Sequence, residues 1–386
     1  MYVFIIYFLI FAVLLYELLT QKRYSKLEAV LFIGILIFFA CRFNLGRDFV
    51  GYFTTHRYFL THQEEMLQYA STRNPGFFYM MYLFMKITPE YRLFMFFVNV
   101  LTLSLCGWTI WNYSKHILFS LLIFMGSGLL EVYYVSGMRQ MISMSFFLFA
   151  FYTFLSKRKI WWYELFCLLA LSFHETAAPS LFVPLLFVIL PRFKKKPIKF
   201  SLIVAVISVL CAVFIGIGVP KILELLHFNT GYHWQYAKVY SYFQNINPSI
   251  LGICMEVLFG VGILLLYQWA EDKNDWTSFQ TLVFFASVCL YICFSGFNLM
   301  SRVADYLQII MVILLPELVS QIKVHHKQIL AFAGIAILNL FLLFMDMHSN
   351  VPAVGVIFNE PYDEFHYPYF TVFEKARIDE MLREDK

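Results

Sequence analysis

The sequence predicts an all-α, polytopic integral membrane protein with about 12 transmembrane helices. Of its 386 residues, 61% are hydrophobic and only 14% are charged, whereas a soluble globular chain carries about 25% charged residues. Apolar runs of about 18 residues recur from end to end, and each can cross a hydrocarbon core of about 30 Å. The strands of an outer-membrane barrel alternate apolar and polar residues, and these runs do not. We expect residues 1–386 to form a single membrane domain.

The apolar runs place the spans in order along the chain. Residues 2–19 form the first span, because they lack the basic n-region and the small-residue cleavage site of a signal peptide. Pro179 and Pro184 interrupt the short run 177–191, which predicts a broken or tilted helix such as membrane proteins tolerate where backbone lines a cavity. The other spans are expected at residues 27–42, 92–112, 117–135, 138–155, 160–173, 199–219, 250–269, 278–297, 303–320 and 328–345.

Basic residues in short loops set the orientation of membrane spans. The three strongest basic clusters lie at residues 22–26, 157–159 and 192–199. All three are cytoplasmic only if residues 76–88, an apolar segment short for a span, do not cross the bilayer. We therefore predict that residues 76–88 are re-entrant or interfacial. In the alternative, in which they span, a basic cluster lies outside.

This topology makes both termini extracytoplasmic, together with the loops 43–91 and 220–249 and the C-terminal tail 346–386. The tail is rich in proline and aromatic residues, and from Thr371 it has the pattern of a short amphipathic helix. Its aromatic faces can stack on sugar rings, or the tail can simply pack on the outer rim of the protein.

Several classes of chemistry lack their sequence signals. All seven cysteines fall inside apolar runs, none forms a CxxC pair, and no His/Cys cluster has zinc spacing. The sequence contains neither a P-loop nor a GxGxxG motif. We therefore expect no obligatory metal, no cofactor and no ATP-driven chemistry within the chain.

Arginines gather at the predicted extracytoplasmic ends of the spans. A guanidinium cannot shed its charge, and its fork matches phosphate oxygens in pairs, so a lipid-linked diphosphate is the natural ligand at that depth. Snorkelling or internal ion pairing is the structural alternative, and Arg302 can pair with Asp305 three residues later. Gly137 permits a tight turn before a helix whose N-terminal amides also favour an anion. The predicted diphosphate ligands are Arg42, Arg47, Arg139, Gln140 and Arg302.

A proton acceptor for an attacking hydroxyl is expected near the same face. An imidazole or a carboxylate can fill this role, although His174 can also be a satisfied packing residue. The candidates are His174, Glu175, Asp48 and Asp305. Glu131 and Glu256 lie deeper, where they can pair with arginines or position a polar ligand.

At these residues the chain resembles the EpsG-like family of bacterial polysaccharide polymerases, which work like the Wzy proteins. Four segments carry the resemblance: residues 42–52 (RFNLGRDFVGY), 136–140 (SGMRQ), 173–177 (FHETA), and Ser301-Arg302 followed by Tyr306. The family usually has a small Ser after the His, whereas this chain has Glu175. The change either adds a carboxylate to the site or reflects a different sugar substrate.

The resemblance implies a membrane glycosyltransferase with a GT-C-like fold in the bacterial inner membrane. It would transfer a growing glycan from undecaprenyl diphosphate to the non-reducing end of a lipid-linked repeat unit, on the extracytoplasmic face. Its partners would be the lipid-linked donor and acceptor, the bilayer, a flippase and a chain-length regulator; no nucleic acid is expected. Two alternatives stay open: a lipid-linked oligosaccharide flippase, and a membrane acyltransferase that acts on sugar hydroxyls.

Overall fold

The computed structural model describes residues 2–43, 49–72, 74–127, 129, 137–214, 250–294, 298–349 and 370–371. These residues are almost entirely helical, as the sequence predicts. The chain divides into two compact units. The first comprises residues 1–177 and 324–386, and the second comprises residues 178–323.

The first unit is built on long apolar helices and a layer of short ones. Outside the layer the helices are α1 (Tyr2–Thr20), α2 (Ser25–Ala40), α6 (Tyr91–Tyr113), the 10-residue α7 (Ile117–Gly126), α8 (Met138–Thr153), α9 (Ile160–Phe173) and α18 (His325–Ser349). The short helices are α3 (Phe49–Thr61), α4 (Gln63–Thr72) and α5 (Pro75–Ile87). A 3₁₀ turn, η2 (Leu155–Lys157), follows α8, and the strand β1 (Arg42–Phe43) pairs antiparallel with β2 (Phe370–Thr371).

Helix α8 forms the core of the first unit. Nearly every described side chain along it is buried, and it packs between α6 and α9. Helices α1 and α18 have the opposite character, because they expose large apolar side chains to the surroundings. An exposed apolar flank is stable in lipid, whereas water would disfavour it.

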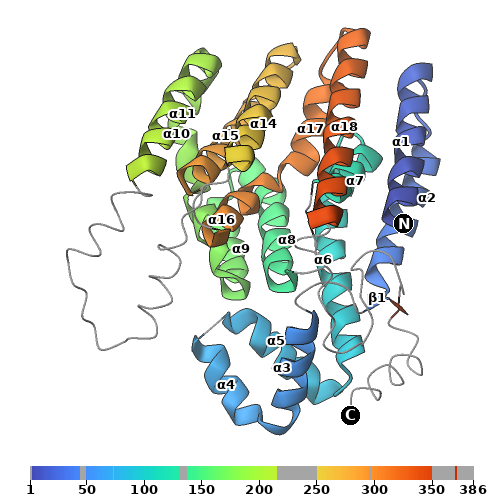
Figure 1. Cartoon of the computed structure of the whole chain (residues 1–386), viewed down its shortest axis with the longest axis vertical. Helices are drawn as coiled ribbons and strands as arrows, with labels where there is room; N and C mark the ends of the chain where they lie inside the picture. The colour runs from blue at the N-terminus through green and yellow to red at the C-terminus, as the bar shows by residue number, and fades with distance from the viewer. Residues whose placement is uncertain are drawn as a thin grey trace. The chain divides into compact units, whose positions relative to one another are not determined.

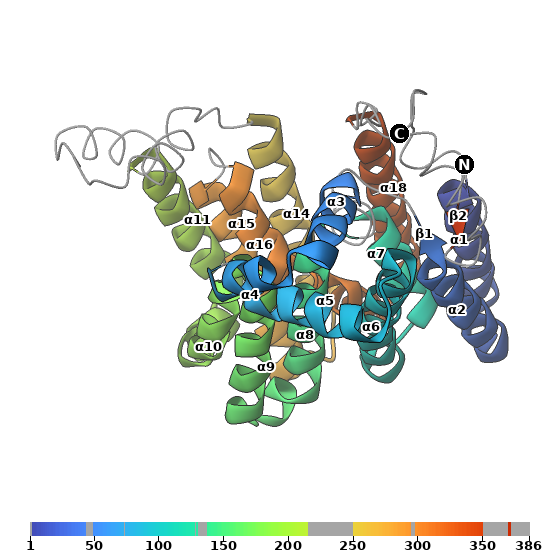
Figure 2. The ribbon, with the colours of Figure 1, turned by 90° about the horizontal axis from the view of Figure 1, so that it is seen from below.

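The three short helices form a layer at one end of α6, α8 and α9 (Figures 1 and 2). The sequence assigned residues 43–91 to a loop and did not predict α3 or α4. Helix α5 covers most of the segment predicted to be re-entrant or interfacial. Its 13 residues extend about 20 Å, which is shorter than a hydrocarbon core of about 30 Å. The length of α5 is therefore consistent with a segment that does not cross.

The second unit contains η3 (Glu175–Leu185), which begins in the first unit, then α10 (Leu186–Lys195), α11 (Pro197–Val213), α14 (Ile250–Trp269), α15 (Asp275–Phe294), α16 (Asn298–Gln308) and α17 (Met311–Ser320). Helix α15 is its core, and it packs against α10, α11, α14, α16 and α17.

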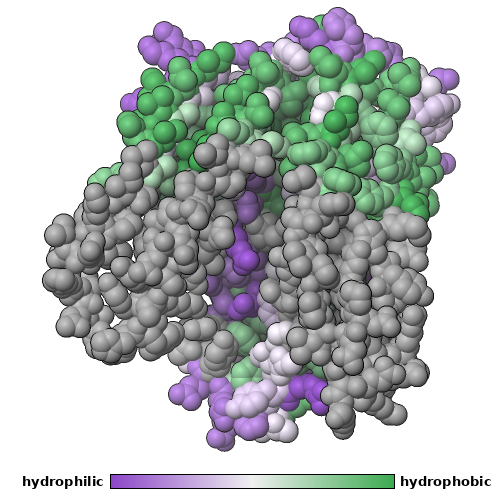
Figure 3. Space-filling model, in the orientation of Figure 1, coloured by the Kyte–Doolittle hydropathy of each residue, from purple (hydrophilic) through white to green (hydrophobic). Residues whose placement is uncertain are grey.

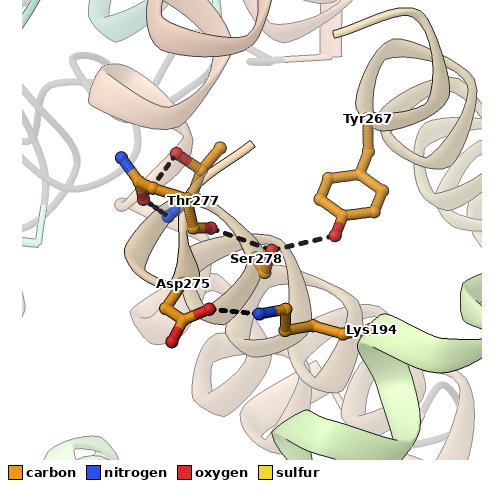
Figure 4. Close-up of polar contacts among 6 residues, drawn as sticks. Lys194, Tyr267, Asp275, Thr277 and Ser278 are labelled. Carbon is orange, nitrogen blue, oxygen red and sulfur yellow. Dashed lines mark hydrogen bonds and ion pairs between the residues drawn. The ribbon is translucent and has the colours of Figure 1, made fainter. Parts of the chain in front are cut away.

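Polar contacts tie the start of α15 to its neighbours (Figure 4). Asn274 caps the helix, because its side-chain oxygen accepts from the Thr277 backbone N–H at 2.7 Å. The Ser278 and Tyr267 hydroxyls lie 2.9 Å apart, which links α15 to α14. Lys194 of α10 forms an ion pair with Asp275.

Prolines break the regular helices of this unit. Pro179 and Pro184 lie within η3, a 3₁₀ segment that continues into α10 without a gap. Residues 175–195 together are long and apolar enough for one span, so the prolines change the helix type here, and a broken or tilted helix stays a prediction. The span expected at residues 303–320 corresponds to α16 and α17, which together are long and apolar enough to cross a membrane, but the two helices meet at a bend of 43° that the sequence did not predict. Three i→i+3 backbone bonds run through residues 307–313 at this bend. Pro316 also cannot donate a backbone hydrogen bond to the preceding turn.

Six described helical segments are long and apolar enough to cross a membrane, and the bent pair α16–α17 makes a seventh. Four other apolar helices, of 10–17 residues, are shorter than a span needs. Hydrophobic residues cover much of the helical surface in Figure 3, and hydrophilic residues cap its upper rim. These features define a multi-pass membrane protein, while the count of about 12 spans stays a prediction.

Candidate active site

The first unit folds two predicted site segments into one helical hairpin, α8–α9. Ser143 of α8 donates its hydroxyl proton to the backbone oxygen of Ala170 in α9, at 2.6 Å. Arg139 precedes Ser143 by four residues, and His174 follows Ala170 by four. Residues four apart share a helix face, so this buried contact aligns the first turn of α8 with the end of α9.

Two contacts orient the half-buried Arg139 guanidinium. Its Nε donates to the Tyr52 hydroxyl of α3 at 3.1 Å, and the guanidinium carbon lies 5.5 Å from the centre of the Tyr52 ring. Its Nη1 donates to the side-chain oxygen of Asn74 at 2.8 Å, in the amide orientation that satisfies both ends of Asn74. These contacts fix the plane of the fork at the start of α8.

Asn74 also binds Glu175, so it connects two of the predicted site residues. Its side-chain amide nitrogen donates to Glu175 Oε2 at 2.8 Å and to the backbone oxygen of Phe173 at 3.3 Å. The Glu175 side chain itself is exposed. A cation and a carboxylate therefore lie on opposite sides of one neutral amide.

The chain around Asn74 is pressed against the end of α9. Asn74 has a φ of 45°, in the left-handed region that asparagine tolerates better than most residues. Pro75 follows as the first residue of α5. At Gly76 an added Cβ would collide with the Ser172 hydroxyl and lie 3.1 Å from the Phe173 ring, so a larger residue would require both side chains to shift.

His174 is buried and its ring is oriented by the next turn. The Thr176 backbone N–H donates to His174 Nδ1 at 3.3 Å, and the Thr176 hydroxyl lies 2.8 Å from the same nitrogen. A backbone N–H can only donate, so Nδ1 is an acceptor and the neutral ring carries its proton on Nε2. In this tautomer His174 Nε2 is a hydrogen-bond donor. Of these two neighbouring residues, the exposed carboxylate of Glu175 is therefore the better candidate for the proton acceptor.

The start of α8 adds backbone donors beside Arg139. Gly137 is the N-cap residue and has no side chain to occupy the first amides of the helix. Helix N-termini present unpaired N–H groups and a positive dipole end, which favour an anion. The neighbouring Gln140, also predicted as a ligand, is buried.

Arg42 lies in the same unit but is enclosed. Its side chain is fully buried, and its backbone oxygen accepts from Asn99 at 3.1 Å. The Tyr91 phenol interacts electrostatically with both Arg42 and Tyr52. The His56 ring packs 5.1 Å from the Tyr91 ring, and burial lowers the pKa of His56 to about 4. Arg42 is thus fully buried near Tyr91, whereas Arg139 is only half-buried.

Two predicted residues of the second unit lie on α16. Arg302 is exposed and Asp305 is partly buried. Gln308, one turn further, donates to Glu256 Oε2 of α14 at 2.9 Å. Asp305 interacts electrostatically with Glu256 and with Tyr291 of α15. Of the remaining candidates, Arg47, Asp48 and Glu131 fall outside the described residues.

Sequence reasoning did not single out Asn74 and did not give Tyr52 a role. The Asn-Pro pair at residues 74–75 is a turn signal that announces a helix start, but it does not reveal which side chains the amide will meet. Within the described ranges, no three His, Cys, Asp or Glu side chains gather closely enough to ligate one metal ion.

Apolar spans with polar residues gathered at the ends of α8 and α9 define a multi-pass helical membrane protein with an ionic site at its helix termini. A sequence profile of the EpsG family matches residues 26–362, and the chain belongs to this family. The match contains Arg42, Arg139, His174, Glu175 and Arg302, so the resemblance seen in the sequence is confirmed. No curated protein and no solved structure matches the chain. Membership indicates a polysaccharide polymerase of the glycosyltransferase type.

Proposed function

We propose that this protein polymerises a polysaccharide from lipid-linked repeat units. The donor is a growing glycan on undecaprenyl diphosphate, and the acceptor is the non-reducing end of the next lipid-linked unit. In the reaction the bond between the anomeric carbon and the phosphate oxygen breaks, and a bond to the acceptor hydroxyl oxygen forms. The hydroxyl proton passes to a base, and the lipid diphosphate leaves with the bonding electrons.

The observation that carries the proposal is the placement of Arg139, an oriented and half-buried guanidinium at the N-terminus of α8, next to the exposed Glu175 across the Asn74 amide. Charge grows on the diphosphate as it leaves, and donors already aimed at that position stabilise it. An arginine fork suits two phosphate oxygens, and the first amides of α8 add to the same field. Arg302, exposed on α16, is proposed as a further diphosphate ligand.

The proton acceptor comes from the set predicted by the sequence. Glu175 is supported by its exposure and by the amide that orients it. His174 is buried with Nδ1 already accepting a hydrogen bond, which supports a role as a donor to the substrate. Asp305 and Asp48 stay proposed alternatives.

The proposed site faces the extracytoplasmic side of the inner membrane. The exposed basic residues of segment 157–159 lie at the opposite end of the α8–α9 hairpin from Arg139. Basic loops favour the cytoplasm, so the Arg139 end is expected outside, where repeat units are joined. Both chain termini are then extracytoplasmic, and residues 1–386 act as one membrane domain.

The test is the size distribution of the surface glycan in a deletion strain that carries each variant. With Arg139→Ala, produced at wild-type level in the membrane, we expect the polymer ladder to collapse to a single repeat unit. The control is Arg57→Ala, because Arg57 is an exposed arginine of α3 outside the site, and its ladder should match wild type. Long-chain polymer made with Arg139→Ala would show that Arg139 is not needed to hold the donor diphosphate.

The same experiment separates the two alternative functions. A flippase would leave repeat units in the cytoplasmic leaflet of the deletion strain. An acyltransferase would leave chain length intact and remove acyl groups from the polymer.

A further inference from the structure

Asn74 contacts three separate elements at the candidate site. Its side-chain oxygen accepts from Arg139 of α8, and its nitrogen donates to Glu175 of η3 and to the Phe173 backbone oxygen at the end of α9. The two contacts to charged groups are both 2.8 Å long. Each half of the amide therefore faces a partner of matching polarity, which is the strong, charge-assisted form of the hydrogen bond.

The backbone holds this amide in place. Asn74 has a left-handed φ of 45°, and the ring of Pro75 fixes its own φ at a value that suits the first residue of a helix. Gly76 lies close to Ser172 and Phe173, and an added Cβ would require both side chains to shift. The turn is thus packed on the end of α9, and it brings the Asn74 side chain into the site.

A neutral amide between a guanidinium and a carboxylate has a chemical consequence. Arginine and a carboxylate that meet directly form a bidentate pair. In such a pair Glu175 would occupy the donors that a phosphate needs, and Arg139 would reduce the basicity of the carboxylate. The Asn74 bridge gives both groups a neutral hydrogen-bond partner and fixes their separation, so the two do not form a bidentate pair with each other.

We propose that Asn74 is a positioning residue of the polymerase site: its amide holds Arg139 against the donor diphosphate and Glu175 against the acceptor hydroxyl. The inference rests on the proposed function and deepens it by placing two substrate groups on either side of one side chain. Asn74 itself need not touch either substrate, because it acts through Arg139 and Glu175.

The test uses the full-length protein in detergent, with lipid-linked repeat units extracted from the deletion strain as substrate. Asn74→Gly removes the amide and keeps the left-handed backbone without strain. We expect kcat to fall at least about 10-fold while KM changes by less than about 3-fold, because misplaced catalytic groups slow the chemical step. The matched control is Gln21→Gly, since Gln21 has a φ of 54° on the turn between α1 and α2, and its kcat should equal wild type.

Asn74→Asp is the second variant. Aspartate keeps an oxygen for Arg139 but faces Glu175 with a second carboxylate in place of a donor, so we expect a similar loss of kcat. A double-mutant cycle then asks whether Asn74 acts through Glu175. If it does, Asn74→Gly lowers kcat much less in a Glu175→Ala background than in wild type.

Two results would overturn the proposal: wild-type kcat with both Asn74 variants, or the same fold-loss from Asn74→Gly in both backgrounds of the cycle. The proposed function fails separately. If Arg139→Ala still makes long polymer, the site assignment is wrong; if Arg139→Ala loses polymer while the Asn74 variants do not, only the positioning role is wrong.

Discussion

The contact between α7 and α18 offers a test of how closely the helices of the first unit pack. Gly126 is the last residue of α7, and it lies against Asn339 of α18. A Cβ added at Gly126 would lie 2.6 Å from the Asn339 Cβ and 3.0 Å from its backbone oxygen. Because the second atom belongs to the backbone, a side-chain rotation cannot relieve the clash, and Gly126→Ala must push the helices apart.

The size of the effect follows from these distances. Carbon atoms in contact settle at about 3.5–4.0 Å, so the helices must separate locally by about 1 Å. Overpacking of this kind costs about 1–3 kcal/mol. Alanine gains up to about 1 kcal/mol over glycine inside a helix, but Gly126 ends its helix and recovers little of this. We therefore expect a net destabilisation of about 1–2 kcal/mol.

The assay is thermal unfolding of the purified protein in detergent. Gly126→Ala should lower the midpoint temperature. The control is Gly334→Ala, because Gly334 lies in α18 and an added Cβ there meets no atom within 4 Å. That substitution should leave the midpoint unchanged or raise it by helix propensity. A wild-type midpoint for Gly126→Ala, or an equal loss for both variants, would show that the close approach of α7 to α18 is wrong.

Two further predictions concern buried polar groups. Glu317 of α17 accepts from Thr277 Oγ1 at 2.6 Å, from Gln280 Nε2 at 3.0 Å and from Gln321 Nε2 at 3.3 Å. Glu317→Ala should therefore destabilise the protein by about 1–3 kcal/mol through lost hydrogen bonds to a charged acceptor, and Glu317→Gln, which keeps one acceptor, should cost less; equal thermal midpoints for all three proteins would contradict this. Burial lowers the pKa of His56 in the folded state to about 4, below its ordinary value, so its contribution is complete above about pH 6.5 and is lost as pH falls toward 4. His56→Phe should flatten the fall of the thermal midpoint between about pH 6.5 and about pH 4. An unchanged slope would show that protonation of buried His56 does not destabilise the fold.

The long apolar helices were predictable because their signal is local. Residues 160–173 and 250–269 form α9 and α14 with the bounds read from the sequence. A continuous apolar run must satisfy its backbone internally in lipid, and a helix does so within the run itself. The break between α16 and α17 was missed, since apolarity continues through it and only the backbone bonds reveal the bend.

The layer of short helices was harder to predict, because the signal for these helices does not lie within their own residues. Helices α3 and α4 carry mixed polar and aromatic residues, so neither reaches the length or apolarity of a span. Helix α4 packs on α5, and α3 places Tyr52 against Phe77 of α5 and Phe53 against Tyr91 of α6. Short helices are marginal alone and form mainly through such tertiary contacts.

The sequence alone determined that the chain is a multi-pass membrane protein, which family it belongs to, and that Arg139 and His174 end one hairpin. These properties depend on composition, motifs and spacing along continuous stretches. The tertiary structure decided that Asn74 lies between Arg139 and Glu175, and that Tyr52 accepts from the same guanidinium. Those contacts join residues up to a hundred positions apart, and they exist only because the docking of α3 and α5 on the α8–α9 hairpin brings their side chains within hydrogen-bond reach.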